Sequence, residues 1–378
     1  MRRNSISSIY VYSFFLIPLL LVVSVFSVSF WIEPDSGDLA RMGGYSENLY
    51  GWEIAQKKFS EPLYTKDKYD KYYDVVVFGD SFTYKNPGEQ TTPGSYWQNF
   101  LINETGLSVI VLDLNRTNLD EILNSSVYKM TPPKIFIYEN IERTLIHVPL
   151  YVGLNHVNAT CDEKASPVIR ASYISPLGLT PTQYKRNKNL LSAAFWEEND
   201  EKQNIISKKV VQASNFIKKR VLQDFFGLNL GNAYRLELRN DKLFSSQKSD
   251  SLLVYKKDFL KEKWSKDNIS AVRCQLLLLQ SKVQENAKTF FIFMGVPDKL
   301  TAYQDIIKMD EYKKISKLDD FDMLGFHFLS LAEPIHKAVK SGADIYFPND
   351  THWGSVAHEL ASEHLISYLI GKKLLIYK

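Results

Sequence analysis

Two short polar motifs, one near each end of the chain, constrain the fold more than any other feature. The apolar run 75–78 leads into Gly-Asp-Ser-Phe at 79–82, and the run 343–347 leads into Asp-Thr-His-Trp at 350–353. Short apolar runs rich in β-branched residues predict buried strands. Loops at the carboxyl ends of parallel strands meet at one edge of a sheet. The sequence therefore predicts that the two motifs lie side by side.

The chain between the two motifs alternates between strand-like and helix-like segments, which indicates an α/β fold with about five parallel strands and right-handed crossovers. We expect strands at 74–79, 107–112, 134–138, 289–294 and 343–347. We expect helices at 94–103, 119–128, 268–286 and 354–370, and a mostly helical stretch at 321–341, bent at Pro334.

The N-terminal region predicts a membrane anchor. Residues 4–32 carry no charge and residues 9–32 are nearly all apolar, which exceeds the roughly 20 residues needed to cross a bilayer. The alternative is a signal peptide, but its apolar core is shorter, roughly 7–15 residues. Trp31 suits the membrane interface, and Arg2 and Arg3 would keep the N-terminus in the cytoplasm.

We expect four regions along the chain. Residues 1–32 form the anchor and residues 33–72, polar and aromatic, form a stalk or linker. The catalytic domain comprises 73–147 and 267–378, and the charged segment 148–266 is a central insertion or a cap over the site.

Composition excludes one class of partner and limits the compartment. The net charge of +3 is too small to indicate nucleic-acid binding. In an oxidising compartment Cys161 and Cys274 would be able to pair, and otherwise they are two separate buried thiols. The sequon at 349–351 would place a glycan inside the second motif, which favours a bacterial protein. No metal-binding pattern such as His-Glu-x-x-His or Cys-x-x-Cys occurs, so we expect no metal.

The two motifs together supply a serine, a base and a carboxylate. A serine hydroxyl needs a base to become nucleophilic, and His352 is that base, with Asp350 fixing its tautomer. Gly79 permits a tight turn after the strand, and the backbone N–H of Ser81 is an oxyanion-hole candidate. Taken alone, Gly-Asp-Ser-Phe would be only a turn. The combination favours catalysis.

Three segments resemble the SGNH/GDSL hydrolase superfamily and, within it, the alginate O-acetyltransferase type of polysaccharide O-acetyltransferase. They are Gly-Asp-Ser-Phe at 79–82, Gly-Val-Pro-Asp-Lys-Leu-Thr-Ala-Tyr at 295–303, and Tyr-Phe-Pro-Asn-Asp-Thr-His-Trp at 346–353. The resemblance covers about residues 70–145 and 285–375. It implies a three-layer SGNH-hydrolase-like fold, an acetyl-serine intermediate on Ser81, and transfer to a sugar hydroxyl without a cofactor.

The chain departs from that family in two ways. Its Asp-x-His block follows the serine block, whereas in the alginate enzymes it comes first, and clear Gly and Asn oxyanion blocks are missing. Asn140 is either an oxyanion donor or a turn residue. Arg143 either binds an acidic sugar or pairs with Glu142 or Glu139.

Other substrate-binding candidates follow the later strands. Lys299 and Tyr303 either line the acceptor groove or lie on the surface as ordinary loop residues. Trp353 is a further candidate for substrate binding.

The leading hypothesis is a membrane-anchored extracytoplasmic O-acetyltransferase that modifies an exopolysaccharide or cell-wall glycan. It would be a single-pass protein of a bacterial inner membrane with a periplasmic or extracellular catalytic domain. The resemblance implies that a multi-span membrane-bound O-acyltransferase supplies the acetyl group. The alternatives are a carbohydrate acetyl esterase with the same triad, and a non-catalytic scaffold of a polysaccharide export complex.

Overall fold

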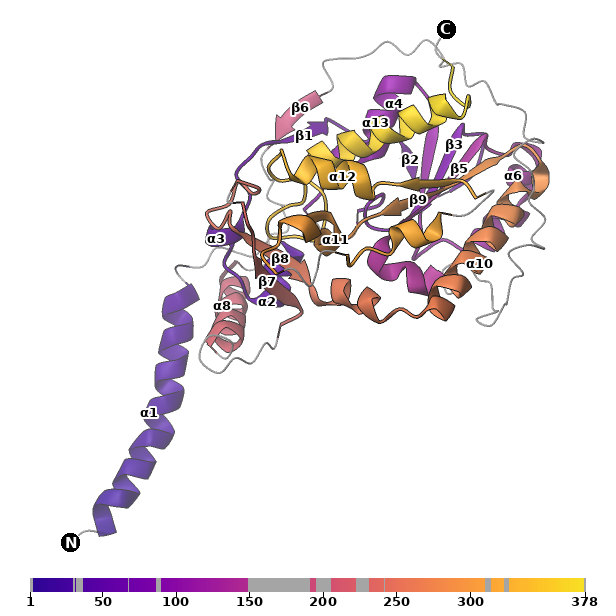
Figure 1. Ribbon diagram of the computed structural model, residues 1–378. Helices are drawn as coiled ribbons and strands as arrows, with labels where there is room; N and C mark the ends of the chain where they lie inside the picture. The colour runs from indigo at the N-terminus through magenta and orange to yellow at the C-terminus, as the bar shows by residue number, and fades with distance from the viewer. Residues whose placement is uncertain are drawn as a thin grey trace.

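The protein is an α/β domain from which one long N-terminal helix, α1 (Arg3–Ser29), projects (Figure 1). The computed structural model describes residues 3–29, 31, 37–66, 68–85, 90–148, 191–194, 205–221, 231–240, 242–309, 314–322 and 326–376. Within α1, residues Tyr10–Ser29 are long and apolar enough to cross a membrane. The expected N-terminal apolar helix is therefore present.

The domain is built on a six-stranded sheet with the strand order β10-β9-β5-β3-β4-β2, and every pair in it is parallel. The strands are β2 (Thr65–Lys66), β3 (Val75–Gly79), β4 (Val109–Asp113), β5 (Ile135–Ile141), β9 (Phe290–Val296) and β10 (Phe328–Ser330). Every residue of the central strands β3, β4, β5 and β9 is buried, as expected of a parallel sheet covered on both faces.

Helices cover both faces of this sheet (Figure 1). On one face lie α4 (Trp97–Thr105), α12 (Ala332–Val339) and α13 (Ser355–Gly371), and on the other α5 (Leu119–Asn124), α6 (Ser126–Met130) and α10 (Lys266–Val283). In β3 the side chains alternate: Val75 and Val77 join the first core, and Val76 and Phe78 join the second. The expected α/β class and parallel sheet are confirmed.

Two expected elements are wrong at the C-terminal side. The run 343–347 is not a sheet strand, because Asp344 adopts a left-handed backbone (φ 54°) and only an isolated bridge joins Tyr346 to Trp353. The sheet is instead extended by β10, inside the stretch expected to be helical. The helix α12 begins only at Ala332, and Pro334 lies in its first turn, where no helical N–H is needed.

The stretch expected to be a stalk, 33–72, is part of the domain where it is described. It forms α2 (Asp38–Gly43), α3 (Glu47–Tyr50), β1 (Gln56–Phe59) and the sheet strand β2. Its aromatic side chains explain the difference, since Tyr45, Tyr50, Phe59, Tyr64 and Tyr69 are all buried. Large buried aromatic side chains bind a segment to a core.

The insertion expected at 148–266 is described only in pieces. They are β6 (Leu191–Ala194), α8 (Ile205–Phe216) with the π-turn Ile217–Val221, β7 (Ala233–Glu237), β8 (Ser251–Tyr255) and the 3₁₀ segment Lys256–Lys263. β6 pairs with β1, and the β7–β8 hairpin packs against α2. The remaining parts, 149–190, 195–204, 222–230 and 241, lie outside the described residues, so the expected cap stays a prediction.

Candidate active site

The serine motif forms a tight turn at the carboxyl end of β3. The carbonyl of Asp80 accepts hydrogen bonds from the backbone N–H groups of Thr83 and Tyr84, both at 3.0 Å. The Asp80 carboxylate accepts from Phe82 N at 3.0 Å and from Ile141 N at 2.8 Å. The aspartate of the motif therefore closes the turn and ties it to the end of β5, while Ser81 stays partly exposed at the edge.

A buried glutamate, Glu139, lies directly below this turn. Its Oε2 accepts from Asp80 N at 3.0 Å, and a Cβ on Gly79 would come within 2.5 Å of the same oxygen. Burial, together with the charge of Asp80, raises the pKa of Glu139 well above its usual range. Burial likewise raises the pKa of Asp80. Only glycine at position 79 leaves room for the carboxyl group of Glu139 to pack against the serine turn.

The histidine motif lies in an irregular loop between β10–α12 and α13, which we call the catalytic loop (Tyr346–Trp353). Its ends are joined by the Tyr346–Trp353 bridge, and Phe347 N donates to His352 O at 3.0 Å. The carboxylate of Asp350 accepts from His352 N at 2.9 Å. Asp350 therefore fixes both the backbone and the ring of His352.

The structure brings Ser81, His352 and Asp350 into one hydrogen-bonded chain. His352 Nε2 lies 2.8 Å from Ser81 Oγ, and His352 Nδ1 lies 2.5 Å from Asp350 Oδ1. Because an ionised carboxylate only accepts, Nδ1 carries the proton and the Nε2 lone pair faces the serine hydroxyl. Burial acts to raise the pKa of Asp350, but the neighbouring imidazole and several hydrogen bonds overcome it, so the pKa is lowered. Asp350 therefore stays ionised opposite the ring.

Asn140 offers an unpaired donor next to this chain. Its side chain is fully buried, its Oδ1 accepts from Thr144 Oγ1 at 2.8 Å, and its Nδ2 has no partner among the described residues. The hydrogen bond from Ile141 N to Asp80 holds Asn140 at the serine turn. A buried donor without a partner is costly, and an oxyanion formed at Ser81 would satisfy it.

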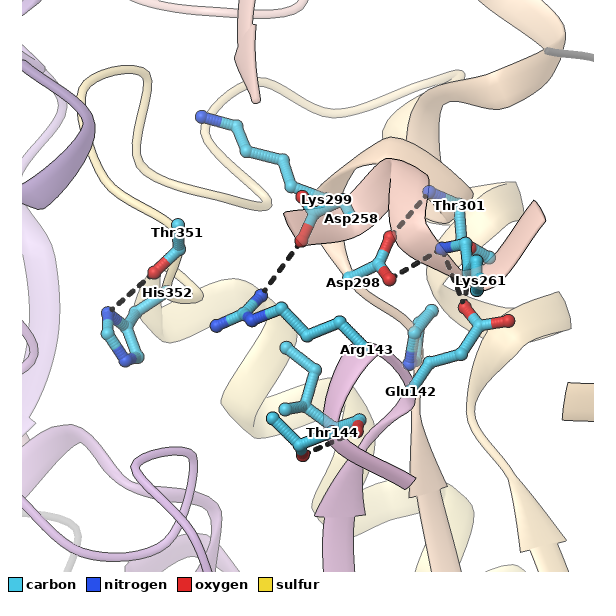
Figure 2. Close-up of polar contacts among 12 residues, drawn as sticks. Glu142, Arg143, Thr144, Asp258, Lys261, Asp298, Lys299, Thr301, Thr351 and His352 are labelled. Atoms are coloured by element: carbon cyan, nitrogen blue, oxygen red, sulfur yellow. Dashed lines mark hydrogen bonds and ion pairs between the residues drawn. The ribbon is translucent and has the colours of Figure 1, made fainter. Parts of the chain in front are cut away.

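The candidate Arg143 belongs to a buried charge cluster at the ends of β5 and β9. It pairs with Asp258 at 3.4 Å rather than with Glu142 or Glu139, and its side chain is only 10% exposed. Figure 2 shows the guanidinium directed at Asp258. The guanidinium also interacts electrostatically with Asp80. Arg143 is thus close enough to the serine turn for its positive charge to act to lower the pKa of Asp80.

Lys261, from the segment expected to be an insertion, is the centre of the same cluster. Its ammonium donates to Asp298 at 2.5 Å, to Thr301 at 2.6 Å and to Glu142 at 3.2 Å (Figure 2). Burial and the charge of Asp298 raise the pKa of Asp258 to about 7. A buried lysine with three partners joins the 3₁₀ segment after β5 (Glu142–His147), the start of α11 (Lys299–Tyr303) and the insertion.

The expected groove residues Lys299 and Tyr303 are fully buried, so neither is a solvated surface residue. Lys299 Nζ donates to the carbonyls of Phe347 (2.7 Å), Pro348 (3.0 Å) and Asp350 (3.0 Å). Burial lowers its pKa to about 7. Lys299 therefore holds the catalytic loop from the protein interior. Its ammonium is directed at backbone carbonyls of the loop and not at a groove for a sugar acceptor.

Trp353 is also fully buried, but it borders a small hollow beside the catalytic loop. Trp52 and Phe347 add aromatic walls, with ring centroids 5.2 Å apart. The remaining lining residues are polar: Gln56, Lys58, Gln90, Thr91, Thr92, Ser95 and Ser355. Several of them are already bonded within the protein, as Thr91 Oγ1 is to Trp353 O at 3.3 Å.

Among the described residues, Asp38, Asp350 and His352 form a group close enough to hold a metal, with ligand atoms within 4.8 Å. Their atoms already have partners, however. Both oxygens of Asp38 accept from Thr351, and both oxygens of Asp350 accept from protein donors. The group fits a hydrogen-bonded triad better than a metal site, and the expectation of no metal stays a prediction.

Sequence reasoning missed Asp38, Glu139 and Lys261. Glu139 had a signal, because a carboxylate inside an otherwise apolar strand must have a structural reason. Asp38 and Lys261 had none, since both lie in charged, irregular stretches. Cys274 is disulfide-bonded, and Cys161, the other cysteine of the chain, lies outside the described residues.

Comparison with known proteins does not assign the chain to a family. No protein-family model, no curated protein and no solved structure matches the chain.

Proposed function

We propose that this protein is a serine-dependent, membrane-anchored O-acetyltransferase of the SGNH hydrolase type that acts on hydroxyl groups of an extracytoplasmic glycan. One observation carries the proposal: the chain Ser81–His352–Asp350 is hydrogen-bonded in the order that nucleophilic catalysis needs, at the carboxyl edge of a parallel sheet.

The residues support a two-step reaction. His352 Nε2 takes the proton from Ser81 Oγ as the oxygen attacks the acetyl carbonyl, and returns it to the leaving group, which departs as the acetyl-serine forms. In the second step His352 deprotonates a sugar hydroxyl as its oxygen attacks the acetyl carbon, and then gives that proton to Ser81 Oγ as the acetyl–Oγ bond breaks. The Ser81 N–H and Asn140 Nδ2 would stabilise the oxyanion in both steps.

Transfer to a sugar, rather than to water, is supported by the resemblance of the Asp-x-His-Trp block and by the apolar helix α1. Trp52, a half-buried aromatic side chain beside the catalytic loop, offers an apolar face on which a sugar ring would stack. The acetyl donor would be a multi-span membrane-bound O-acyltransferase, since one helix cannot carry acetyl across a membrane.

An extracytoplasmic location for the domain is supported by two features. Arg2 and Arg3 precede the apolar helix, which favours a cytoplasmic N-terminus. Cys274 is disulfide-bonded, which fits an oxidising compartment. In a bacterium this would be the outer side of the inner membrane.

The test is acetylation of Ser81 in the full-length protein in detergent, treated with a chromogenic acetyl ester and analysed by intact mass. The Ser81→Ala variant is the essential comparison, and Ser341→Ala, a serine exposed on the surface, is the matched control. The same reactions run with an oligosaccharide acceptor follow the fate of the acetyl group.

We expect an acetyl adduct in the wild type and in Ser341→Ala, none in Ser81→Ala, and its movement to the sugar. Release of acetate at a rate unaffected by sugar would identify an esterase instead. A wild type that forms no adduct and turns over no ester would contradict both enzyme assignments and leave a scaffold.

A further inference from the structure

The segment that follows the membrane helix contacts the catalytic loop directly. We call Gly37–Tyr50 the arm; it contains α2 and α3. Asp38 N donates to Asp350 Oδ2 at 3.0 Å, on the carboxylate oxygen that His352 does not use. The carboxylate of Asp38 accepts from Thr351 N at 2.8 Å and from Thr351 Oγ1 at 2.5 Å. One arm residue therefore holds two consecutive residues of the catalytic loop.

Three further contacts fit the arm to the same loop. Ala40 N donates to Asn349 O at 3.1 Å, and the Asn349 side chain donates to Glu47. A Cβ on Gly37 would lie 2.1 Å from the carbonyl oxygen of Asn349, so the two backbones are in close contact. Gly37 has φ −83°, which any residue can adopt, so only this close approach excludes a side chain.

The other side of the arm packs on the β7–β8 hairpin. Leu39, Ala40 and Tyr45 form a small core with Ala233 and Leu253. The arm is thus held between the hairpin and the catalytic loop.

We propose that Asp38 is a positioning residue for the triad, and that the serine reacts only when the arm is docked on the catalytic loop. This rests on the proposed function, because it concerns the reactivity of Ser81. Eight residues lie between Ser29, the end of α1, and Asp38, so nine Cα–Cα steps join them. A chain of that length spans at most about 32 Å. Asp38, the proposed positioning residue, is therefore tethered within that distance of the membrane helix.

Asp38 acts on His352 through its charge as well as through the position of the loop. Burial and the charge of Asp350 raise the pKa of Asp38, while His352 acts to lower it. By the same interaction, ionised Asp38 favours the imidazolium that forms when His352 takes the serine proton. Other titratable groups interacting with His352 are Asp350, Asp80 and His358.

The test measures the rate at which a fluorophosphonate probe labels Ser81 in the full-length protein in detergent, from pH 5 to pH 9. Asp38→Asn keeps an acceptor for Thr351 N but removes the charge. Asp38→Ala removes both, and Gly37→Ala displaces the arm while leaving Asp38 intact. Gly371→Ala is the matched control, because a Cβ there meets nothing within 4 Å.

We expect Asp38→Ala and Gly37→Ala to label about 100-fold more slowly, since a misplacement of about 1 Å has that effect on catalysis. We expect Asp38→Asn to shift the acid limb of the pH profile down by about one unit, and Asp38→Glu to restore part of the rate. Melting curves establish that each variant is folded. If Asp38→Ala or Gly37→Ala does not fold, the isosteric Asp38→Asn still decides the question by its pH profile.

The two proposals fail in different ways. A wild type whose Ser81 resists the probe overturns the proposed function, and this inference with it. A reactive wild type together with folded Asp38 and Gly37 variants that keep its rate and pH profile overturns this inference alone.

Discussion

Replacing Lys299 with methionine tests whether a residue behind the catalytic loop controls the chemistry in front of it. Methionine keeps an unbranched apolar stem of similar length but lacks the ammonium. In the wild type that ammonium donates to the carbonyls of Phe347, Pro348 and Asp350. Because Asp350 orients His352, the loss of these three hydrogen bonds should move the base relative to Ser81.

The change in the free energy of unfolding should be limited, because two terms of similar size oppose each other. Burial lowers the pKa of Lys299 from 10.5 to about 7, and keeping the group charged in the fold therefore costs about 5 kcal/mol at about 1.4 kcal/mol per pKa unit. Hydrogen bonds from a charged donor contribute about 1.5–3 kcal/mol each, or about 5–9 kcal/mol for three. The free energy of unfolding should thus fall by no more than about 4 kcal/mol.

The rate should fall in a variant that is still folded. We expect kcat for a chromogenic acetyl ester to fall about 100-fold, as for a misplacement of about 1 Å. The wild-type rate should also decline above about pH 7, where Lys299 loses a proton and with it one of three N–H donors, and the variant should lack this limb. Urea unfolding and steady-state kinetics measure the two quantities separately.

Lys308→Met is the matched control, since Lys308 is exposed and pairs with the exposed Glu237. It should leave both rate and stability unchanged. A Lys299→Met variant with wild-type kcat would refute the reasoning, because the loop would then hold its position without the ammonium. A variant that is unfolded would refute the balance of energies.

Three further substitutions follow from the site. Asn140→Ala should lower kcat for the acetyl ester about 10²–10³-fold with KM nearly unchanged; an unchanged kcat would exclude Asn140 from the oxyanion hole. Asp350→Asn should lower kcat about 10⁴-fold, and retention of more than a tenth of the rate would argue against a triad. Asp258 has a folded pKa of about 7 against an ordinary 3.8, so the fold retains a proton that the unfolded chain has lost, and this group's stabilisation declines as pH rises from 4 to 7. Asp258→Asn should remove that decline in the free energy of unfolding, about 1.4 kcal/mol per pH unit, as measured by urea unfolding at pH 5 and pH 7. An equal loss of unfolding free energy between these two pH values in the wild type and the variant would contradict this prediction.

The sheet was predictable where strands are fully buried and uninterrupted. The runs around Val75–Gly79, Val109–Asp113, Ile135–Ile141 and Phe290–Val296 each carry enough β-branched and aromatic residues to indicate a strand without any tertiary information. The edges were not predictable. β2 has two residues and β10 has three, too few for any periodicity to appear.

The run at 343–347 shows the opposite error. Its composition indicates a strand, but Asp344 takes a left-handed backbone and its carboxylate binds Ser245 N at 2.9 Å. A side-chain contact 99 residues away decides the local conformation there. Pattern reasoning has no access to such a contact.

Ser81, His352 and Asp350 were identifiable because each carries its chemistry in its residue type and lies beside an apolar run. Lys299 and Asp38 have residue types that are usually solvated. Their contacts to the catalytic loop span 48 or more residues of sequence, and 312 in the case of Asp38 and Asp350. The sequence therefore indicates the three side chains of the proposed triad more readily than it indicates the residues that hold them.

The residues that hold the catalytic loop were not predictable because of how the loop itself is built. The catalytic loop contains no sheet strand, and an isolated bridge between its ends is its regular pairing among the described residues. Backbone groups that a sheet would have paired are satisfied instead by Lys299 from α11 and by Asp38 and Ala40 from the arm. These groups come from two segments outside the sheet, α11 and the arm, and the side chains of Lys299 and Asp38 belong to none of the hydrophobic clusters, so replacing either side chain leaves the hydrophobic core intact. Substitutions of Lys299 or Asp38 should therefore lower the reactivity of Ser81 more than the melting temperature. Substitutions of core residues in β3 or β5 should lower the melting temperature more than the reactivity of Ser81.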